Sequence, residues 1–271
     1  MKPLTPEIVF FDIDETLHRK KTQYMPESAV DAIKALHERG IHTAIATGRA
    51  QVILPPHINH LFTSGIMDTL ISINGQYNCR FDDGERVTLS HHPLDPAMVE
   101  RLITLLRKRD FAYAAIAPDA VALSTDHSRI DAVLDGISGQ HIDPDYALNN
   151  PIYQMLLFTD EAETQALVDD EAIAPNLDLI RWHQYCTDVL NTNGAKARGI
   201  RDVCAAMNIP LERTMAFGDG FNDIEMMQTV GFGVAMGDAR DPVKAAANYI
   251  TGTVEEHGIA NALYDLGVLN K

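Results

Sequence analysis

Short apolar segments alternate with helical patterns at both ends of this chain, and this alternation limits the possible folds more than any other feature. Residues 8–12 read Ile-Val-Phe-Phe-Asp, an apolar run typical of a strand buried on both faces. A helical pattern follows at about 27–39 and ends at Gly40. Further strands are expected at 42–46, 69–73, 214–217, 232–235 and 248–251, and further helices at about 195–208, 221–228 and 240–247. The alternation predicts an α/β fold, a parallel sheet covered by helices on both sides.

The middle of the chain follows a different pattern. Between about residues 81 and 187 we expect helices at 96–109, 127–135 and 161–171, and strands near 112–116, 120–124, 152–158 and 177–182. This stretch is far longer than an ordinary connection within a domain. Turn-rich sequences flank it, Phe81-Asp82-Asp83-Gly84 before and Asn191-Thr192-Asn193-Gly194 after. We therefore expect a core domain from 1–80 and 188–271, and an inserted α+β domain at 81–187.

Composition excludes several classes of protein. The 271 residues are 46% hydrophobic and 22% charged, which is ordinary globular usage. No apolar run approaches the ~20 residues that cross a bilayer. With 22 basic and 38 acidic residues, the net charge of −16 repels nucleic-acid backbones and anionic lipids. The N-terminus lacks a signal-peptide pattern, and three scattered cysteines fit a reducing compartment, so we expect a cytoplasmic protein with neither nucleic-acid nor membrane partners.

The first chemical motif, Asp12-Ile13-Asp14-Glu15-Thr16-Leu17, directly follows the first expected strand. Ligands of such sheets bind at the carboxyl ends of the strands. Two carboxylates two residues apart could serve as nucleophile and proton donor, provided that a cation keeps the first ionised. These residues alone are equally compatible with a turn capped by aspartate.

Three further motifs lie at strand ends or helix starts. In Thr47-Gly48-Arg49 a hydroxyl and a glycine allow close approach to a phosphate. Lys196 stands at an expected helix start, where a cation is unfavourable unless an anion binds beside it. The run Gly218-Asp219-Gly220-Phe221-Asn222-Asp223 presents oxygen atoms suited to a hard cation such as Mg²⁺. Taken singly, these are an ordinary loop, a surface lysine and a capped turn.

Taken together and in this order, the motifs resemble those of the haloacid dehalogenase superfamily. The runs Gly233–Ala239 and Glu256–Ala260 are similar to its Cof-type phosphatases in particular. The resemblance covers about residues 1–80 and 188–271. It implies a Rossmann-like parallel-sheet core with an inserted type IIB cap that closes over the site and selects the leaving group.

The resemblance also implies a function, the Mg²⁺-dependent hydrolysis of small phosphorylated metabolites, with sugar phosphates as the expected class. Asp12 would attack phosphorus and become a phospho-aspartate, while Asp14 would protonate the leaving oxygen and later activate water. The phosphate would be held by Ile13, Thr47, Gly48, Lys196 and Asn222. The metal would be bound by Asp12, Asp14 (through its carbonyl oxygen) and Asp219, with Asp223 and Arg49 orienting these groups.

Other functions remain open at this level. The same superfamily includes phosphomutases, and a non-catalytic sensor of phosphorylated ligands could use the same pocket, although pure binding needs no nucleophile. A nucleotide-binding oxidoreductase is excluded because no Gly-x-Gly-x-x-Gly follows the first strand. The expected oligomeric state is a monomer or a homodimer.

Two features depart from the family pattern or add to it. Glu15 stands where the family usually has glycine. We expect a helical or turn-like backbone there, because a left-handed one would cost a glutamate about 1–2 kcal/mol. The run His18-Arg19-Lys20-Lys21 could attract anionic substrates, but is predicted to be a solvated basic turn.

Overall fold

The computed structural model describes residues 5–135, 137, 139–170, 173, 176–192 and 195–270. The chain divides into two compact units. The core unit comprises Met1–Gly48, Pro55–Ser90 and Ala195–Lys271, and the inserted unit comprises Arg49–Leu54 and His91–Gly194. Both boundaries of the inserted unit lie further along the chain than the expected 81 and 187.

The core unit is built on an eight-stranded sheet with the order β14-β13-β12-β1-β2-β3-β4-β5. Neighbouring strands from β14 to β3 are parallel, whereas β4 is antiparallel to β3. The strands are β1 (Ile8–Phe11), β2 (His42–Ala46), β3 (Thr69–Ser72), β4 (Tyr77–Asp82), β5 (Glu85–His91), β12 (Thr214–Gly218), β13 (Phe232–Ala235) and β14 (Tyr249–Ile250). The central strand β1 is buried along its whole length, as its unbroken apolar sequence predicts.

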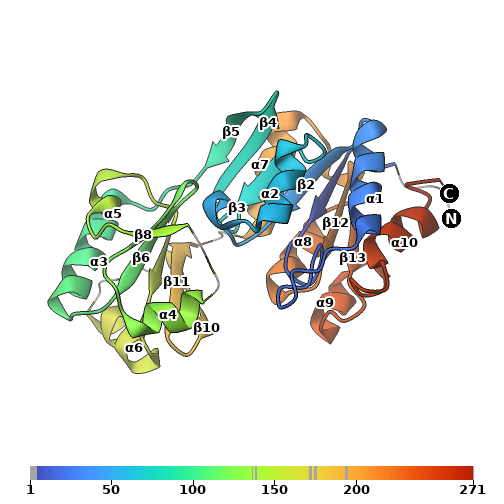
Figure 1. The fold of residues 1–271 in the computed structure, drawn as a ribbon. Coiled ribbons are helices and arrows are strands. Elements are labelled where there is room, and N and C mark those ends of the chain that lie inside the picture. Colours follow the sequence, from blue (N-terminus) through green and yellow to red (C-terminus); the bar gives the residue numbers. More distant parts are fainter. Residues whose placement is uncertain are drawn as a thin grey trace. The chain divides into compact units, whose positions relative to one another are not determined.

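Helices cover both faces of this sheet (Figure 1). They are α1 (Glu27–Glu38), α2 (Pro56–Thr63), α7 (Lys196–Met207), α8 (Ile224–Thr229), α9 (Asp241–Ala246) and α10 (Gly258–Asp265). Phe10 of β1 belongs to the same buried cluster as Ile200 of α7 and Met226 of α8. The next residue, Phe11, stacks on Phe217 with ring centroids 5.3 Å apart. Successive side chains of β1 thus enter cores on opposite faces, which confirms the α/β core.

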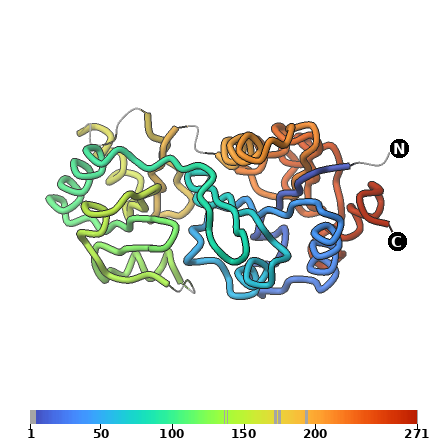
Figure 2. Tube along the Cα trace, turned by 90° about the horizontal axis from the view of Figure 1, so that it is seen from above, coloured from blue at the N-terminus to red at the C-terminus, as the bar shows by residue number. Residues whose placement is uncertain are grey.

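The inserted unit contains a six-stranded sheet with the order β10-β11-β9-β6-β7-β8, and Figure 2 follows the chain through it from green to yellow. Its strands are β6 (Tyr113–Ala117), β7 (Ala120–Leu123), β8 (Gln140–Ile142), β9 (Gln154–Leu157), β10 (Leu177–His183) and β11 (Cys186–Asn191). Its helices are α3 (Pro96–Lys108), α4 (Ser128–Leu134), α5 (Tyr146–Asn149) and α6 (Glu161–Asp169). All strand pairs are antiparallel except β7 with β8.

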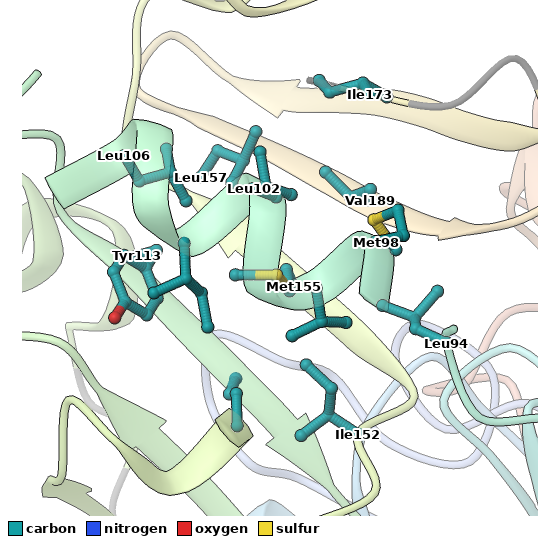
Figure 3. Packing of buried hydrophobic residues seen from close by; sticks show 14 of the residues in the cluster. Leu94, Met98, Leu102, Leu106, Tyr113, Ile152, Met155, Leu157, Ile173 and Val189 are labelled. Carbon is teal, nitrogen blue, oxygen red and sulfur yellow. The ribbon is translucent and has the colours of Figure 1, made fainter. Parts of the chain in front are cut away.

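Helix α3 supplies much of the core of the inserted unit. Its buried residues Met98, Leu102 and Leu106 recur every four positions, so they share one face of the helix. That face packs against Met155 and Leu157 of β9 (Figure 3). The unit therefore has its own apolar core and the expected α+β architecture.

The hairpin of β4 and β5 explains the later start of the inserted unit. Asp83 and Gly84 were expected to mark a domain boundary, but they form the two-residue turn of this hairpin, both with positive φ (50° and 83°). Strand β5 is mostly exposed, with Val87 and Leu89 as its only apolar residues, and this short alternation was not recognised as a strand from the sequence. Strand β11 in turn pairs with β9 and β10, which extends the inserted unit at its other end.

Some helices also differ from expectation. The expected helix at 221–228 is a 3₁₀ turn, η3 (Phe221–Asp223), followed by α8. Helices α2 and α10 were not anticipated. Among the described residues, no helix is long and apolar enough to cross a bilayer.

Candidate active site

The candidate active-site residues gather where neighbouring parallel strands of the core sheet end. Asp12 directly follows β1, Thr47 follows β2 and Asp219 follows β12. These three strands are adjacent in the sheet, in the order β12-β1-β2. The Asp12 N–H donates to the carbonyl oxygen of Phe217 at 3.0 Å, which ties the start of its loop to β12. Parallel topology therefore brings motifs distant in sequence to one edge of the sheet.

Lys196, the first residue of α7, lies among these loops with 1% of its surface exposed. Its Nζ donates to Oδ1 of Asp12 at 2.5 Å and to Oδ1 of Asp223 at 2.7 Å. Burial by itself would lower the lysine pKa, but the two carboxylates outweigh it and raise the pKa above its ordinary value. Lys196 is thus a buried cation held between two carboxyl groups, not the surface lysine that an isolated occurrence would suggest.

Two carboxyl groups at this site hold their protons unusually strongly. Burial raises the pKa of Asp12 from 3.8 to about 8, even though Lys196 opposes the shift. Burial and the neighbouring Asp223 raise the pKa of Asp219 to about 7. One lysine therefore supplies too little positive charge to keep both carboxyl groups ionised near neutral pH.

Asp12, Asp219 and Asp223 can each offer one carboxylate oxygen to a metal ion, and these three oxygen atoms all lie within 4.8 Å of one another. A cluster of carboxylate oxygens is the donor set that Mg²⁺ prefers, so these residues fit a divalent cation. Thr16 Oγ1 donates to Oδ1 of Asp219 at 3.0 Å, which orients that carboxylate. The predicted metal ligand Asp14 is not in this group of side chains, and its predicted contribution was through its carbonyl oxygen.

Asp223 also shapes the loop after β12. Its Oδ2 accepts hydrogen bonds from the N–H groups of Asp219 at 3.0 Å and Gly220 at 2.9 Å. A Cβ atom at Gly218 would lie 2.6 Å from the carboxyl group of Asp223, so a side chain at 218 would displace it. Asp223 is fully buried and bonded to both the loop and Lys196, which suits the predicted orienting role.

The side chain of Asp14 contacts a histidine that the sequence analysis did not place in the site. His18 Nε2 lies 3.0 Å from Asp14 Oδ1, and His18 Nδ1 lies 2.8 Å from Nε2 of His57 on α2. Burial lowers the pKa of His57, and the charge of His18 lowers it further by a smaller amount. The prediction of a solvated basic turn is wrong for His18, which is fully buried. Only the four-residue spacing from Asp14 could have indicated this contact.

The prediction of a solvated basic turn is also wrong for Arg19, the next residue, which is paired with carboxylates. Its guanidinium group contacts Glu15 at 2.7 Å, Glu255 at 2.5 and 2.7 Å, and Asp238. Lys20 and Lys21 are exposed, as a solvated turn predicts. The loop after β1 is thus tied to the C-terminal part of the core unit through one arginine.

The backbone of Glu15 is left-handed, with φ of 59°, which contradicts the expected helical or turn-like conformation. Its carboxylate compensates locally, since it accepts from the N–H of Lys20 at 3.0 Å as well as from Arg19. Position 15 therefore has the left-handed backbone that glycine adopts freely. In this chain it is occupied by a glutamate whose side chain stabilises the following loop.

The predicted phosphate-binding residues occupy several environments. Ile13 and Thr47 are buried, whereas Asn222 is exposed. The carbonyl oxygen of Thr47 accepts from the N–H of Asn74 at 3.0 Å, and a Cβ atom at Gly48 would lie 3.2 Å from Oδ1 of the same asparagine. The loop after β2 thus packs closely on the loop after β3. Arg49 is assigned to the inserted unit, and its orienting role stays a prediction.

Comparisons with known proteins identify the family. The sequence pattern of the family described as haloacid dehalogenase-like hydrolase matches residues 9–263. The chain is 35% identical over 269 residues to YkrA of Bacillus subtilis (strain 168), a protein named provisionally as a phosphatase, and the match covers 97% of this chain and 98% of YkrA. It is 27% identical over 281 residues to the pyridoxal phosphate phosphatase YbhA of Escherichia coli (strain K12), covering 96% of this chain and 98% of YbhA.

The fold agrees with these matches. The structure is similar, with a TM-score of 0.79 and 28% identity, to that of BT4131, described as a subclass IIB sugar phosphatase of the haloacid dehalogenase superfamily. The similarity covers 97% of this chain and 99% of the other. The parallel core with an inserted α+β unit, the order of the motifs and the family match lead to one conclusion: the chain belongs to the haloacid dehalogenase-like hydrolases and is one of their phosphatases.

Proposed function

We propose that this protein is a Mg²⁺-dependent phosphatase that hydrolyses small phosphorylated metabolites, sugar phosphates above all, through a phospho-aspartate formed on Asp12. The observation that carries the proposal is the contact of Lys196 with both Asp12 and Asp223. This contact holds the Lys196 cation against the carboxyl group of Asp12, which would lie in solvent if the loop after β1 were only a turn capped by aspartate. Phosphoryl transfer needs positioned groups that neutralise spread negative charge, and the same contact supplies one of them.

In the first half-reaction, a carboxylate oxygen of Asp12 attacks phosphorus and the bond between phosphorus and the ester oxygen breaks. Asp14 gives its proton to that oxygen, so the leaving group departs as an alcohol. The phosphoryl oxygens are held by the Lys196 ammonium, the Thr47 hydroxyl, the Asn222 amide, and the backbone at Ile13 and Gly48. The product of this step is phosphorylated Asp12.

In the second half-reaction, Asp14 takes a proton from water, whose oxygen attacks phosphorus. The bond between phosphorus and Asp12 breaks, inorganic phosphate leaves, and both carboxyl groups return to their starting states. Asp14 thus alternates between acid and base, which requires that its carboxyl group keep one position through both steps.

The metal would be held by Asp12, Asp219 and the carbonyl oxygen of Asp14, with Asp223 and Arg49 orienting the surrounding groups. When bound, Mg²⁺ supplies positive charge that keeps Asp12 ionised and neutralises the phosphoryl group. The raised pKa values of Asp12 and Asp219 support this need for a second cation.

The substrate class is supported by the relatives. The name of BT4131 specifies sugar phosphates and that of YbhA pyridoxal phosphate, both small phosphomonoesters. The inserted unit is expected to choose among them.

The test is phosphate release from p-nitrophenyl phosphate and a panel of sugar phosphates, with Mg²⁺ or with EDTA, by the wild type and Asp12→Asn. We expect release that needs Mg²⁺ and is lost in Asp12→Asn. Transfer of the phosphoryl group to another hydroxyl of the sugar, without phosphate release, would instead indicate a phosphomutase. Binding of the same esters without turnover would indicate a sensor.

A further inference from the structure

The contact between Asp14 and His18 points to a role for two histidines that the family motifs do not include. We propose that His18, held by His57, is a positioning residue that fixes the Asp14 carboxyl group and determines which of its oxygens carries the proton delivered to the leaving group. The inference rests on the proposed function, because it assigns a partner to the general acid of that reaction.

The position of His18 is fixed from several sides. Its N–H donates to the carbonyl oxygen of Ile13 at 3.1 Å, and its own carbonyl oxygen accepts from the N–H of Glu15 at 2.8 Å. Its ring is fully buried, with one nitrogen 3.0 Å from Asp14 and the other 2.8 Å from His57. A ring constrained at its backbone and at both nitrogens can hold a flexible carboxyl group in one rotamer.

His57 links this contact to a second element of the fold. It lies in the first turn of α2, while Asp14 and His18 lie in the loop after β1. The two imidazole rings have centroids 4.9 Å apart. His57 is only partly buried, so the three residues run from the site toward the surface of the core unit. Both ring nitrogens of the buried His18 thus have partners, and together these contacts fix the orientation of its ring toward Asp14.

The chemistry of the contact selects one oxygen of Asp14. An ionised carboxylate can only accept, so Nε2 of His18 carries the hydrogen and donates it to Oδ1. While that donation persists, the proton of the acid form resides on Oδ2, which is the atom that would deliver it to the leaving oxygen. His18 itself exchanges no proton with substrate. It keeps the carboxyl group oriented in both halves of the reaction.

The experiment compares two substrates that differ only in their leaving group, p-nitrophenyl phosphate and phenyl phosphate. Nitrophenolate departs without protonation, whereas the more basic phenolate needs the general acid. The ratio of the two kcat/KM values therefore reports acid catalysis in the first half-reaction. Because both values come from one preparation, incomplete folding of a variant cancels from the ratio.

We expect His18→Leu to lower kcat/KM for phenyl phosphate by about 10- to 100-fold and that for p-nitrophenyl phosphate by less than about 3-fold, a fraction of the 10²–10⁴ typical of a general acid. His18→Gln, whose amide N–H can replace the Nε2 donor, should restore the wild-type ratio. His57→Ala should shift the ratio in the same direction by a smaller factor, and it remains informative if His18→Leu does not fold. His60→Ala, an exposed change on the same helix, is the control and should leave the ratio unchanged.

Asp14→Asn distinguishes a failure of this inference from a failure of the proposed function. If it shifts the ratio strongly while His18→Leu and His57→Ala do not, the histidines are structural and the inference is overturned. If Asp14→Asn leaves the ratio unchanged while the wild type remains active, Asp14 is not the acid, and the proposed function fails at that residue.

Discussion

The ammonium nitrogen of Lys196 lies 2.5 Å from Oδ1 of Asp12, although 184 positions of sequence separate the two residues. Asp12 begins the loop after β1 and Lys196 begins α7, so the contact requires both core segments on either side of the inserted unit. Asp12, the proposed nucleophile, therefore meets its cation only when both segments of the core unit are folded together.

Replacing Lys196 by methionine tests that dependence. The change leaves Asp12 and Asp223 buried without their cation, and breaking a buried ion pair in this way costs about 3–5 kcal/mol. We expect a loss of that order in the free energy of unfolding, measured with urea, and a loss of about 100-fold or more in kcat. Lys34→Met removes an exposed lysine of α1 and should change neither quantity. A stable and active Lys196→Met variant would contradict the assignment.

Removal of metal should affect stability in a pH-dependent way. The pKa values of Asp12 and Asp219 are raised in the folded protein, to about 8 and about 7, so the folded protein holds protons that the unfolded chain has released. Stability of the metal-free protein therefore falls as pH rises from about 4 to about 8. Mg²⁺ needs the ionised carboxylates, so its binding strengthens over the upper part of that range.

The measurement is the unfolding temperature with Mg²⁺ or EDTA at about pH 6 and about pH 8. We expect Mg²⁺ to raise it more at the higher pH, because ligand binding to the folded state stabilises by mass action. Asp219→Asn should abolish the Mg²⁺-dependent increase. Equal increases at both pH values would show that these carboxyl groups do not bind the metal.

The sequence predicted the core where burial dictates composition. Strand β1 is apolar throughout because both its faces are covered, and the order of motifs along parallel strands indicated that Asp12 and Lys196 would lie near one edge. Strand β5 was missed because it is mostly exposed and its alternation is limited to Val87 and Leu89. Nor could the sequence place His18, because a buried histidine in a run of basic residues resembles a solvated turn until its partners, Asp14 and His57, are known in space.

The left-handed backbone of Glu15 yields a paired test. Glu15→Ala and Glu15→Gly both remove the contacts with Arg19 and Lys20, but only glycine relieves the backbone. We therefore expect the glycine variant to be more stable than the alanine variant by about 1–2 kcal/mol in urea unfolding. Equal stabilities would mean that residue 15 is not left-handed in solution.

Gly75 tests the approach of α7 to the loop after β3. Its φ is +76°, and a Cβ atom there would lie 2.7 Å from the carbonyl oxygen of Ala195, next to Lys196. Gly40 has a similar φ of +73° but nothing within 4 Å. Gly40→Ala should cost only the backbone penalty of about 1–2 kcal/mol. Gly75→Ala should cost about 1–3 kcal/mol more and lower kcat, because it displaces the start of α7. Matching losses in the two variants would show that the loop and α7 are not in close contact.

The central claim, that Asp12 is the nucleophile, is tested most directly by a rapid-mixing experiment with Asp14→Asn and p-nitrophenyl phosphate in Mg²⁺. This variant retains Asp12 but lacks the proposed base that activates water, and the substrate needs no acid to lose its leaving group. We predict a burst of nitrophenolate equal to the enzyme concentration, followed by slow turnover, with one phosphoryl group located on Asp12 by mass spectrometry after acid quenching. The absence of a burst, or a phosphoryl group on any other residue, would contradict the account.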